Sequence, residues 1–359
     1  MNPTAGSATK TASAGALLRA CLVWDNHGCM PVGRPLDTSF LPQLQRYRAA
    51  GVDAVMLNIG FGEMGVEEHL RTLAGMRHWL KARPAEYVLI DTVADIELAR
   101  ASGRLAVGFD IEGANAIADQ PSLVQLYYNL GVRWMLLAYN RNNRVGGGCQ
   151  DEDTGLTAYG REVIAEMERV GMQVCCSHTG QRTASDVFAM ATKPVIFSHS
   201  NANAVHAHPR NIPDDVIRAC AATGGVVCIN GLSTFLGPNE NLSEAFARHV
   251  DHVAQLVGPQ HVGLGLDYVF DTQELNDYVA KMRHTFPPGL GYDKDVQFVA
   301  PEQLEGIVQI LISWGYQSDD LKAVLGGNLL RLAGAVWQAP YCSRVADSLE
   351  SHIPAKSDR

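Results

Sequence analysis

The strongest constraint on the fold of this chain is a series of eight short apolar runs separated by amphipathic segments. The runs are rich in Val, Ile and Leu and are mostly continuous rather than alternating, as in strands that are buried on both faces. They cover residues 18–24, 54–59, 105–111, 134–139, 173–177, 195–198, 225–229 and 261–266. We therefore expect each run to form one strand of a buried parallel sheet.

Segments with helical periodicity lie between the runs and follow the last one. They cover residues 43–50, 66–81, 122–130, 159–170, 183–190, 214–222, 244–256, 301–314 and 318–336, with an interruption of the last expected at Gly326 and Gly327. A strand followed by a helix, repeated eight times, is the pattern of a parallel (β/α)8 barrel, the TIM barrel. A doubly wound open sheet is the alternative, but no G-x-G-x-x-G follows the first run.

The sequence therefore predicts an α/β protein with one (β/α)8 barrel domain at residues 17–340. We expect residues 1–16 to be a disordered lead-in and residues 341–359 to be a mobile polar tail. Residues 271–298 contain several Pro and Gly residues and are expected to form a long loop after the eighth strand. In such barrels the loops that follow strands cover the active-site face.

Composition narrows the function classes. Apolar residues make up 47% of the 359 residues, enough for a large core, and 19% charged residues is low for a disordered chain. The net charge of −9 argues against nucleic acid as a partner. No apolar run reaches the roughly 18 residues of a membrane span, and no secretory signal is recognised. Several of the eight cysteines lie in apolar runs, which favours buried free thiols and a cytoplasmic location.

Polar side chains that commonly bind metals stand where the apolar runs stop. The strand-end sequences are Asp25-Asn26-His27-Gly28-Cys29, Asp110-Ile111-Glu112, Tyr139-Asn140, Ser177-His178, Ser198-His199 and Leu266-Asp267. A single His after a strand is usually structural, but two successive Ser-His endings favour a shared site. The carboxyl ends of barrel strands meet at one rim, and imidazole with carboxylate suits zinc or a similar divalent ion. We therefore expect a metal site at this rim.

The residue types suggest individual roles. His27 and Cys29 lie on one side of an extended chain, so both could reach one metal, although Cys29 is equally compatible with a packing thiol. Asp267 could take a proton from a metal-activated water and pass it to a leaving amine, or it could cap a helix. Arg210, in the loop after the sixth run, could bind a substrate carboxylate.

Together these motifs resemble the membrane (renal) dipeptidase family, metallopeptidase family M19 of the amidohydrolase superfamily. The resemblance extends from about Val23 to Leu332. It is carried by DNH at 25–27, IEG at 111–113, GLTAYGREV at 155–163, SH at 177–178, PVIFSHSNA at 194–202, HPRN at 208–211, GGVV at 224–227, HVGLGLD at 261–267 and GGNLLR at 326–331.

The resemblance implies a pair of zinc ions bridged by Glu112. One ion would be held through the first motif, by His27 and Cys29, and the other by His178 and His199. Arg210 matches the residue that binds the substrate carboxylate, and Asp267 matches the residue that transfers the proton. The implied reaction is hydrolysis of a dipeptide, often one with a D-residue at its C-terminal side.

Two residues depart from the family pattern. Cys29 stands where the usual motif Asp-x-His-x-Asp has its second Asp, so one ion instead of two is an alternative. Tyr139 stands where a His usually polarises the scissile carbonyl. A Tyr can still donate a hydrogen bond to an oxyanion, so we expect Tyr139 to act in substrate binding and catalysis.

These departures keep two alternatives open. One is a mononuclear amidohydrolase-superfamily enzyme acting on a non-peptide amide or carboxylate substrate, and the other is a catalytically silent homologue. The expected partner is a small dipeptide or amide with a carboxylate, without nucleic acid or membrane. The sequence leaves the oligomeric state open, with a homodimer as one option.

Overall fold

Eight parallel strands close into a barrel in the computed structural model, which describes residues 13–29, 38–238, 240–292 and 296–338. The barrel strands are β1 (Trp24–Cys29), β2 (Ala54–Phe61), β4 (Leu105–Glu112), β5 (Val132–Leu136), β6 (Gln173–Cys175), β7 (Ile196–Phe197), β8 (Val226–Ile229) and β9 (Val262–Leu264). They pair in this order, and pairing of Asp25 in β1 with Leu264 in β9 closes the ring. The predicted (β/α)8 barrel is confirmed.

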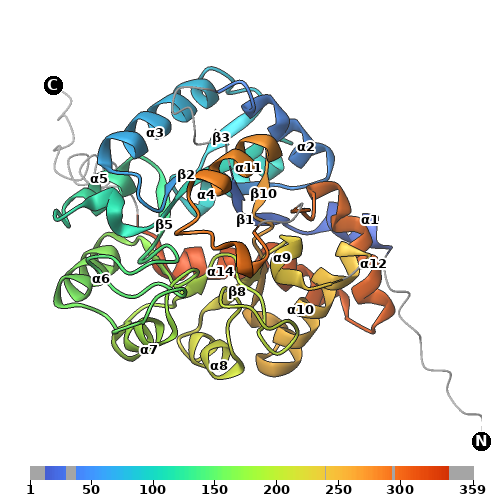
Figure 1. Ribbon diagram of the computed structural model, residues 1–359. Helices are drawn as coiled ribbons and strands as arrows, with labels where there is room; N and C mark the ends of the chain where they lie inside the picture. The colour runs from blue at the N-terminus through green and yellow to red at the C-terminus, as the bar shows by residue number, and fades with distance from the viewer. Residues whose placement is uncertain (1–12, 30–37, 239, 293–295, 339–359) are drawn as a thin grey trace, which may run out of the picture.

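Helices surround the strands, as Figure 1 shows in a view along the barrel. They are α2 (Leu44–Ala49), α3 (Val66–Lys81), α5 (Leu123–Asn129), α6 (Ala158–Val170), α7 (Gln181–Met190), α8 (Asp214–Ala222), α10 (Leu242–Val257), α12 (Leu304–Ser313), α13 (Ser318–Lys322) and α14 (Asn328–Val336). The strands are buried almost throughout, and the apolar faces of the helices pack against their outer side. This burial on both faces explains why the strands read as continuous apolar runs.

The first apolar run was predicted wrongly in part. Residues 18–20 end a helix, α1 (Ala14–Ala20), and the strand begins only at Trp24. The side chain of Ser13 caps this helix by accepting a hydrogen bond from the Ala16 N–H, and Leu17 and Leu18 are buried. Helix α1 therefore begins inside the segment expected to be a disordered lead-in. Residues 1–12, and residues 339–359 with the expected tail, lie outside the described part of the chain.

A strand–helix unit that the sequence analysis missed lies between β2 and β4. Strand β3 (Tyr87–Leu89) is not one of the ring strands; it pairs with residues 105–107 at the start of β4 and is followed by α4 (Val93–Ala101). Two of its three residues are partly exposed, and the apolar run to which it belongs, residues 87–90, is short. Another short strand, β10 (Tyr268–Val269), pairs with β1.

The expected interruption at Gly326 and Gly327 is a change of hydrogen-bonding pattern rather than a break. A π-helical turn at Ala323–Gly327 joins α13 directly to α14. Gly326 packs against the chain just before β1, where a Cβ atom would lie 2.7 Å from the carbonyl oxygen of Leu22. The absence of a side chain allows this close approach.

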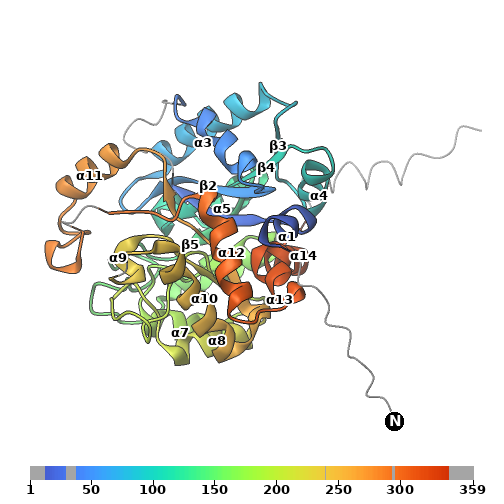
Figure 2. The ribbon, with the colours of Figure 1, turned by 90° about the vertical axis from the view of Figure 1, so that its right-hand side faces the viewer.

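The long loop after the last barrel strand contains a helix, α11 (Thr272–Lys281). Figure 2 shows that α11 projects from the face of the barrel at which the strands end. Helix α9 (Ser233–Leu236) lies on the same face, after β8. We call residues 271–292 the cap.

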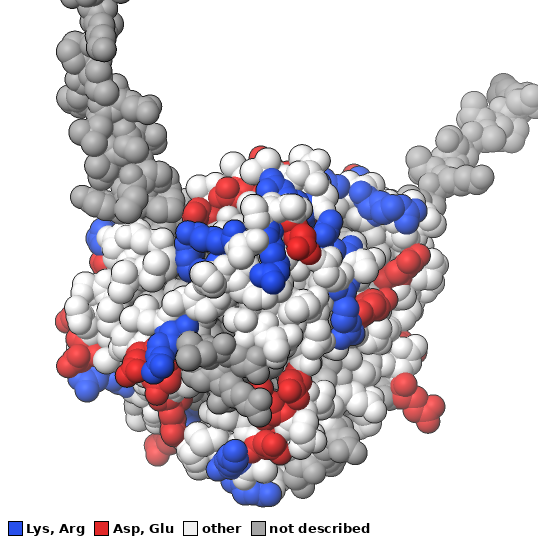
Figure 3. Space-filling view, turned by 90° about the horizontal axis from the view of Figure 1, so that it is seen from above, with Lys and Arg blue, Asp and Glu red and all other residues white. Residues whose placement is uncertain are grey.

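Within the described residues, no helix has the length and apolar character needed to cross a membrane. On the face drawn in Figure 3, acidic and basic side chains are both present and interspersed, and some of them lie directly side by side.

Candidate metal centre

Six predicted site residues converge at the carboxyl ends of the barrel strands. His27 and Cys29 belong to β1, and Glu112 is the last residue of β4. The remaining three, His178, His199 and Asp267, lie two or three residues after the ends of β6, β7 and β9. Their nitrogen, sulfur and oxygen atoms form three sets within which every pair lies within 4.8 Å, namely His27–Cys29–Glu112, Glu112–His178–His199 and His27–His199–Asp267.

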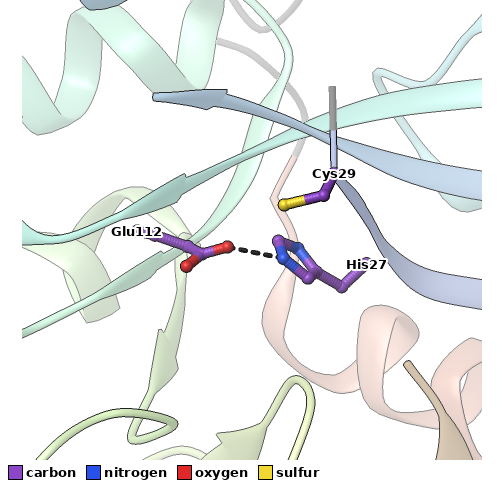
Figure 4. Close-up of side chains that lie close together, drawn as sticks. All are labelled: His27, Cys29 and Glu112. Carbon is purple, nitrogen blue, oxygen red and sulfur yellow. Dashed lines mark ion pairs between the residues drawn. The ribbon is translucent and has the colours of Figure 1, made fainter. Parts of the chain in front are cut away.

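Glu112 lies at the centre of this cluster. Its Oε1 atom is 2.5 Å from His27 Nε2, and its Oε2 atom is 3.5 Å from His178 Nε2. The two carboxylate oxygens thus face imidazoles from opposite sides of the barrel mouth. Figure 4 shows the thiol of Cys29 on the same side of β1 as His27, directed toward the space beside Glu112. A carboxylate in this position can bridge two cations.

Each imidazole is held by a partner on its other nitrogen. His27 Nδ1 lies 3.2 Å from Asp110 Oδ2, and Asn58 donates to Asp110 Oδ1 at 3.1 Å and to Glu112 Oε1 at 3.2 Å. His178 Nδ1 donates to Asn140 Oδ1 at 2.7 Å. Partners of this kind orient metal-binding imidazoles and fix their tautomers.

His199 and Asp267 are also held in place by neighbouring side chains. His199 Nδ1 is 2.8 Å from Ser198 Oγ, and His199 Nε2 is 2.9 Å from His178 Nε2. Asp267 accepts a hydrogen bond from Asn230 at 2.8 Å, and its other oxygen lies 3.4 Å from His27 Nε2. The site is therefore a set of side chains whose orientations are fixed before any ligand binds.

Sequence reasoning did not assign these orienting residues, although some signals were present. Asp110 precedes Glu112 by two residues in a strand and so lies on the same side of it. Asn140 and Ser198 adjoin predicted site residues, and Asn230 is the first polar residue after the seventh apolar run. Asn58 lies inside a continuous apolar run, and only the pairing of β2 with β4 places it opposite Asp110.

The donor set fits a metal ion. His27 Nε2 is buried and makes no hydrogen bond of acceptable geometry in the described structure, although carboxylate oxygens face it. Burial, aided by the charge of Arg210, holds the pKa of His178 and His199 well below the usual range, so both are neutral and carry a lone pair. Converging nitrogen, oxygen and sulfur donors of this kind suit zinc.

Backbone strain is concentrated at the same rim. Four described residues other than glycine have a clearly positive φ, and three of them are Asn140 (59°), His178 (59°) and Asp267 (55°). Such conformations are uncommon for residues with a Cβ and persist only where the surrounding structure imposes them. The strain is consistent with a site built for chemistry rather than for stability.

A cavity of about 380 Å³ opens above the cluster. Cys29, Glu112, His178 and Asp267 line it together with Tyr139, whose ring stacks on His178 at a centroid distance of 4.1 Å. Burial raises the pKa of Tyr139 well above its usual value, so its hydroxyl remains protonated.

Arg210 does not line this cavity but a neighbouring one of about 320 Å³, and His178 lines both. The Arg210 side chain is buried, and one of its Nη atoms donates to the carbonyl oxygen of His199 at 3.3 Å. Its guanidinium lies 5.2 Å from the ring centroid of Phe235. Within the described part of the chain, its Nε has no hydrogen-bond partner and no carboxylate pairs with it. The buried charge is thus available to an anionic ligand.

Sequence comparison gives a consistent result. The family described as membrane dipeptidase (peptidase family M19) matches residues 37–284, a range that begins after His27 and Cys29. Dipeptidase aclJ from Aspergillus oryzae is 32% identical over 283 residues, covering 77% of this chain and 61% of that protein. Dipeptidase verJ from Clonostachys rogersoniana is 33% identical over 240 residues, covering 66% and 56%. The matches thus span about three-fifths of the length of these relatives.

Solved structures share the fold. An amidohydrolase from Pseudomonas aeruginosa superimposes with a TM-score of 0.81 at 23% identity, covering 91% of this chain and 99% of that one. A metallo peptidase from Rhodobacter sphaeroides, bound to a phosphinate mimic of L-Ala-D-Ala, has a TM-score of 0.72 at 20% identity, with coverage of 88% and 99%. The resemblance predicted from the sequence motifs is confirmed, and the chain belongs to the membrane dipeptidase family, peptidase family M19.

Proposed function

We propose that this protein is a metal-dependent dipeptidase that hydrolyses the amide bond of small dipeptides. The observation that carries the proposal is the placement of Glu112, whose two oxygens face His27 on one side and His178 on the other. The names of the relatives aclJ and verJ, both dipeptidases, support the same activity. The chain spans 61% or less of these relatives, so the assignment rests on the site as much as on them.

Two zinc ions would be held by the cluster. His27, Cys29 and Glu112 would bind one, and Glu112, His178 and His199 would bind the other. When bound, the ions would supply a water molecule activated for attack on the scissile carbonyl and polarise that carbonyl. Desolvation raises the pKa of the partly buried Cys29 thiol, and a cation beside it favours its ionised form.

Three further residues would act on the substrate. Asp267 accepts a proton and passes it to the leaving amine, while Asn230 holds its second oxygen in place. Tyr139, kept protonated by burial, donates a hydrogen bond to the developing oxyanion. Arg210 binds the substrate carboxylate, because its buried charge has no carboxylate partner within the described residues.

A second candidate is a mononuclear enzyme of the amidohydrolase superfamily that acts on a non-peptide amide or carboxylate substrate. Cys29 favours it, because a thiol stands where the resemblance leads us to expect a carboxylate ligand. We further propose a cytoplasmic location on the basis of the seven free cysteines of the described chain, five of which are buried.

The proposal is tested by a library of L,L and L,D dipeptides incubated with the purified protein and added Zn²⁺. We expect amino acid release from a subset of the library, abolished by a chelator and restored by Zn²⁺. His199→Ala should remove the activity while the circular dichroism spectrum stays that of a folded barrel. Absence of hydrolysis across the library with metal bound would contradict the proposal and favour the second candidate.

A further inference from the structure

The cap presents an apolar helix face to the cavity above the metal cluster. No residue of α11 is fully buried, so this helix contributes little to the core. Its less exposed apolar side chains are Leu275, Tyr278 and Val279, which recur at the spacing of one helix face and line the cavity. Within the described residues, other side chains therefore cover this face only in part.

Aromatic rings continue this apolar surface around the cavity. Phe61, the last residue of β2, packs edge-to-face on Tyr278 with ring centroids 4.8 Å apart. Phe286 of the cap lies 6.0 Å from Tyr278 and 6.2 Å from Tyr139, which stacks on His178. The rings thus form an unbroken series from the cap to a predicted metal ligand. We call Phe61, Tyr278 and Phe286 the aromatic wall.

The wall and the cluster face the same space. The single cavity of about 380 Å³ is lined by the three wall residues and also by Glu112 and Asp267. Its size lies near the lower end of the roughly 300–1,000 Å³ typical of small-molecule sites. A substrate whose scissile bond sits at the cluster can therefore place an adjoining group against the wall.

Charged residues of the cap, among them Asp271, Asp277 and Lys281, also line this cavity, but their side chains are exposed to solvent. At the start of α11 the Asp271 side chain accepts a hydrogen bond from the Glu274 N–H, and Asp277 accepts a hydrogen bond from the Gln273 side chain. Both carboxylates are exposed, as is Lys281. The cavity therefore has a polar rim and an apolar interior, the arrangement of a site that selects an apolar group.

We propose that the aromatic wall is a specificity pocket for an apolar, preferably aromatic, side chain of the dipeptide. The inference rests on the proposed dipeptidase function and deepens it by naming the substrate class. Burying a Phe side chain in such a pocket, relative to Ala, should raise kcat/KM by about 10–100-fold. A Lys or Glu side chain at the same position should gain less, because its charge would lose water against the three uncharged rings of the wall.

The test compares kcat/KM of the zinc-loaded enzyme on Ala-Ala, Phe-Ala, Ala-Phe, Lys-Ala and Ala-Glu, together with L,D forms. We expect a Phe-containing dipeptide to be preferred over Ala-Ala by about 10-fold or more. Tyr278→Ala and Phe61→Ala should each reduce that ratio by at least about 5-fold. Tyr316→Ala is the matched control, because Tyr316 is similarly half-buried but hydrogen-bonds Asp251 away from the cavity, and it should leave the ratio unchanged.

The outcomes separate this inference from the proposed function. Hydrolysis of dipeptides with no preference for Phe, or an unchanged ratio in both wall variants, would overturn the inference and leave the dipeptidase function standing. If none of the dipeptides is hydrolysed although metal is bound, the proposed function fails, and this inference fails with it.

Discussion

Replacing Asp110 with Asn tests whether the side chains that hold the His27 imidazole in place contribute to metal binding. In the wild-type protein one carboxylate oxygen of Asp110 faces His27 Nδ1 at 3.2 Å, and the other accepts from Asn58 at 3.1 Å. An amide of the same shape has only one oxygen, so it can accept from only one of these two donors. The other donor then faces an NH₂ group. If the NH₂ group faces His27, the imidazole loses its hydrogen-bond acceptor; if the amide oxygen faces it, the imidazole keeps an acceptor but loses the negative charge beside it.

The expected size of the effect follows from this geometry. Asp110 is fully buried, so water cannot replace the lost acceptor. Loss of a partner of a metal-binding imidazole typically weakens metal binding by 10–100-fold, which corresponds to about 1.4–2.7 kcal/mol. We expect Asp110→Asn to weaken Zn²⁺ binding by this factor at the ion held by His27.

Zinc affinity would be measured by competition with a chromophoric chelator, with thermal unfolding as a check that the variant folds. Asp53→Asn is the matched control, because the Asp53 carboxylate accepts from the Val23 N–H at the opposite end of the strands. The control should keep the wild-type affinity. An Asp110→Asn protein that is folded and binds zinc as tightly as wild type would refute the reasoning.

Three other predictions concern single residues. Cys29→Ala should lower metal occupancy and Cys29→Asp should maintain or raise it by elemental analysis; unchanged metal content and rate in both would make Cys29 a packing residue. Arg210→Ala should mainly raise KM, whereas Asp267→Asn should lower kcat by about 10²–10⁴-fold and remove one limb of the pH–rate profile; a near-normal kcat would make Asp267 a structural cap. Burial, reinforced by the neighbouring charges of His206, His252 and Arg248, lowers the pKa of His249 to about 4, and its Nδ1 accepts from the Ala202 N–H. Because His249 binds a proton more tightly in the unfolded chain, its protonation should lower the free energy of unfolding by about 3 kcal/mol between pH 6.5 and 4. Urea unfolding of His249→Gln should therefore show a smaller pH dependence than that of the wild type.

The barrel was predictable because its strands are buried on both faces. Burial produces continuous apolar runs, and the amphipathic segments between them match helices such as α3 and α8 in both bounds. The first run was misassigned because a short apolar stretch does not distinguish a strand from a buried helix end. Strand β3 was missed although residues 87–90 form a continuous apolar run, because four apolar residues alone do not identify a strand.

The candidate ligands were predictable for a topological reason, whereas their surroundings were not. Parallel strands bring their carboxyl ends to one rim, so polar residues after successive apolar runs must meet there. The partner of each ligand depends on strand register and loop conformation. Asn58 reaches Glu112 only through the pairing of β2 with β4, and the loop after β7 determines that Arg210 opens onto the neighbouring cavity. Neither relation is encoded in a local sequence pattern.

The most direct test of the central claim is the zinc content of the purified protein after loading and removal of free metal. Two sets of donors sharing Glu112 predict close to two zinc ions per chain in the wild-type protein. His199→Ala should lose the ion held with His178 while retaining a folded barrel. A content near one ion in the wild type would favour the mononuclear alternative. A folded wild-type protein that retains no zinc, or a His199→Ala variant with undiminished zinc, would contradict the account.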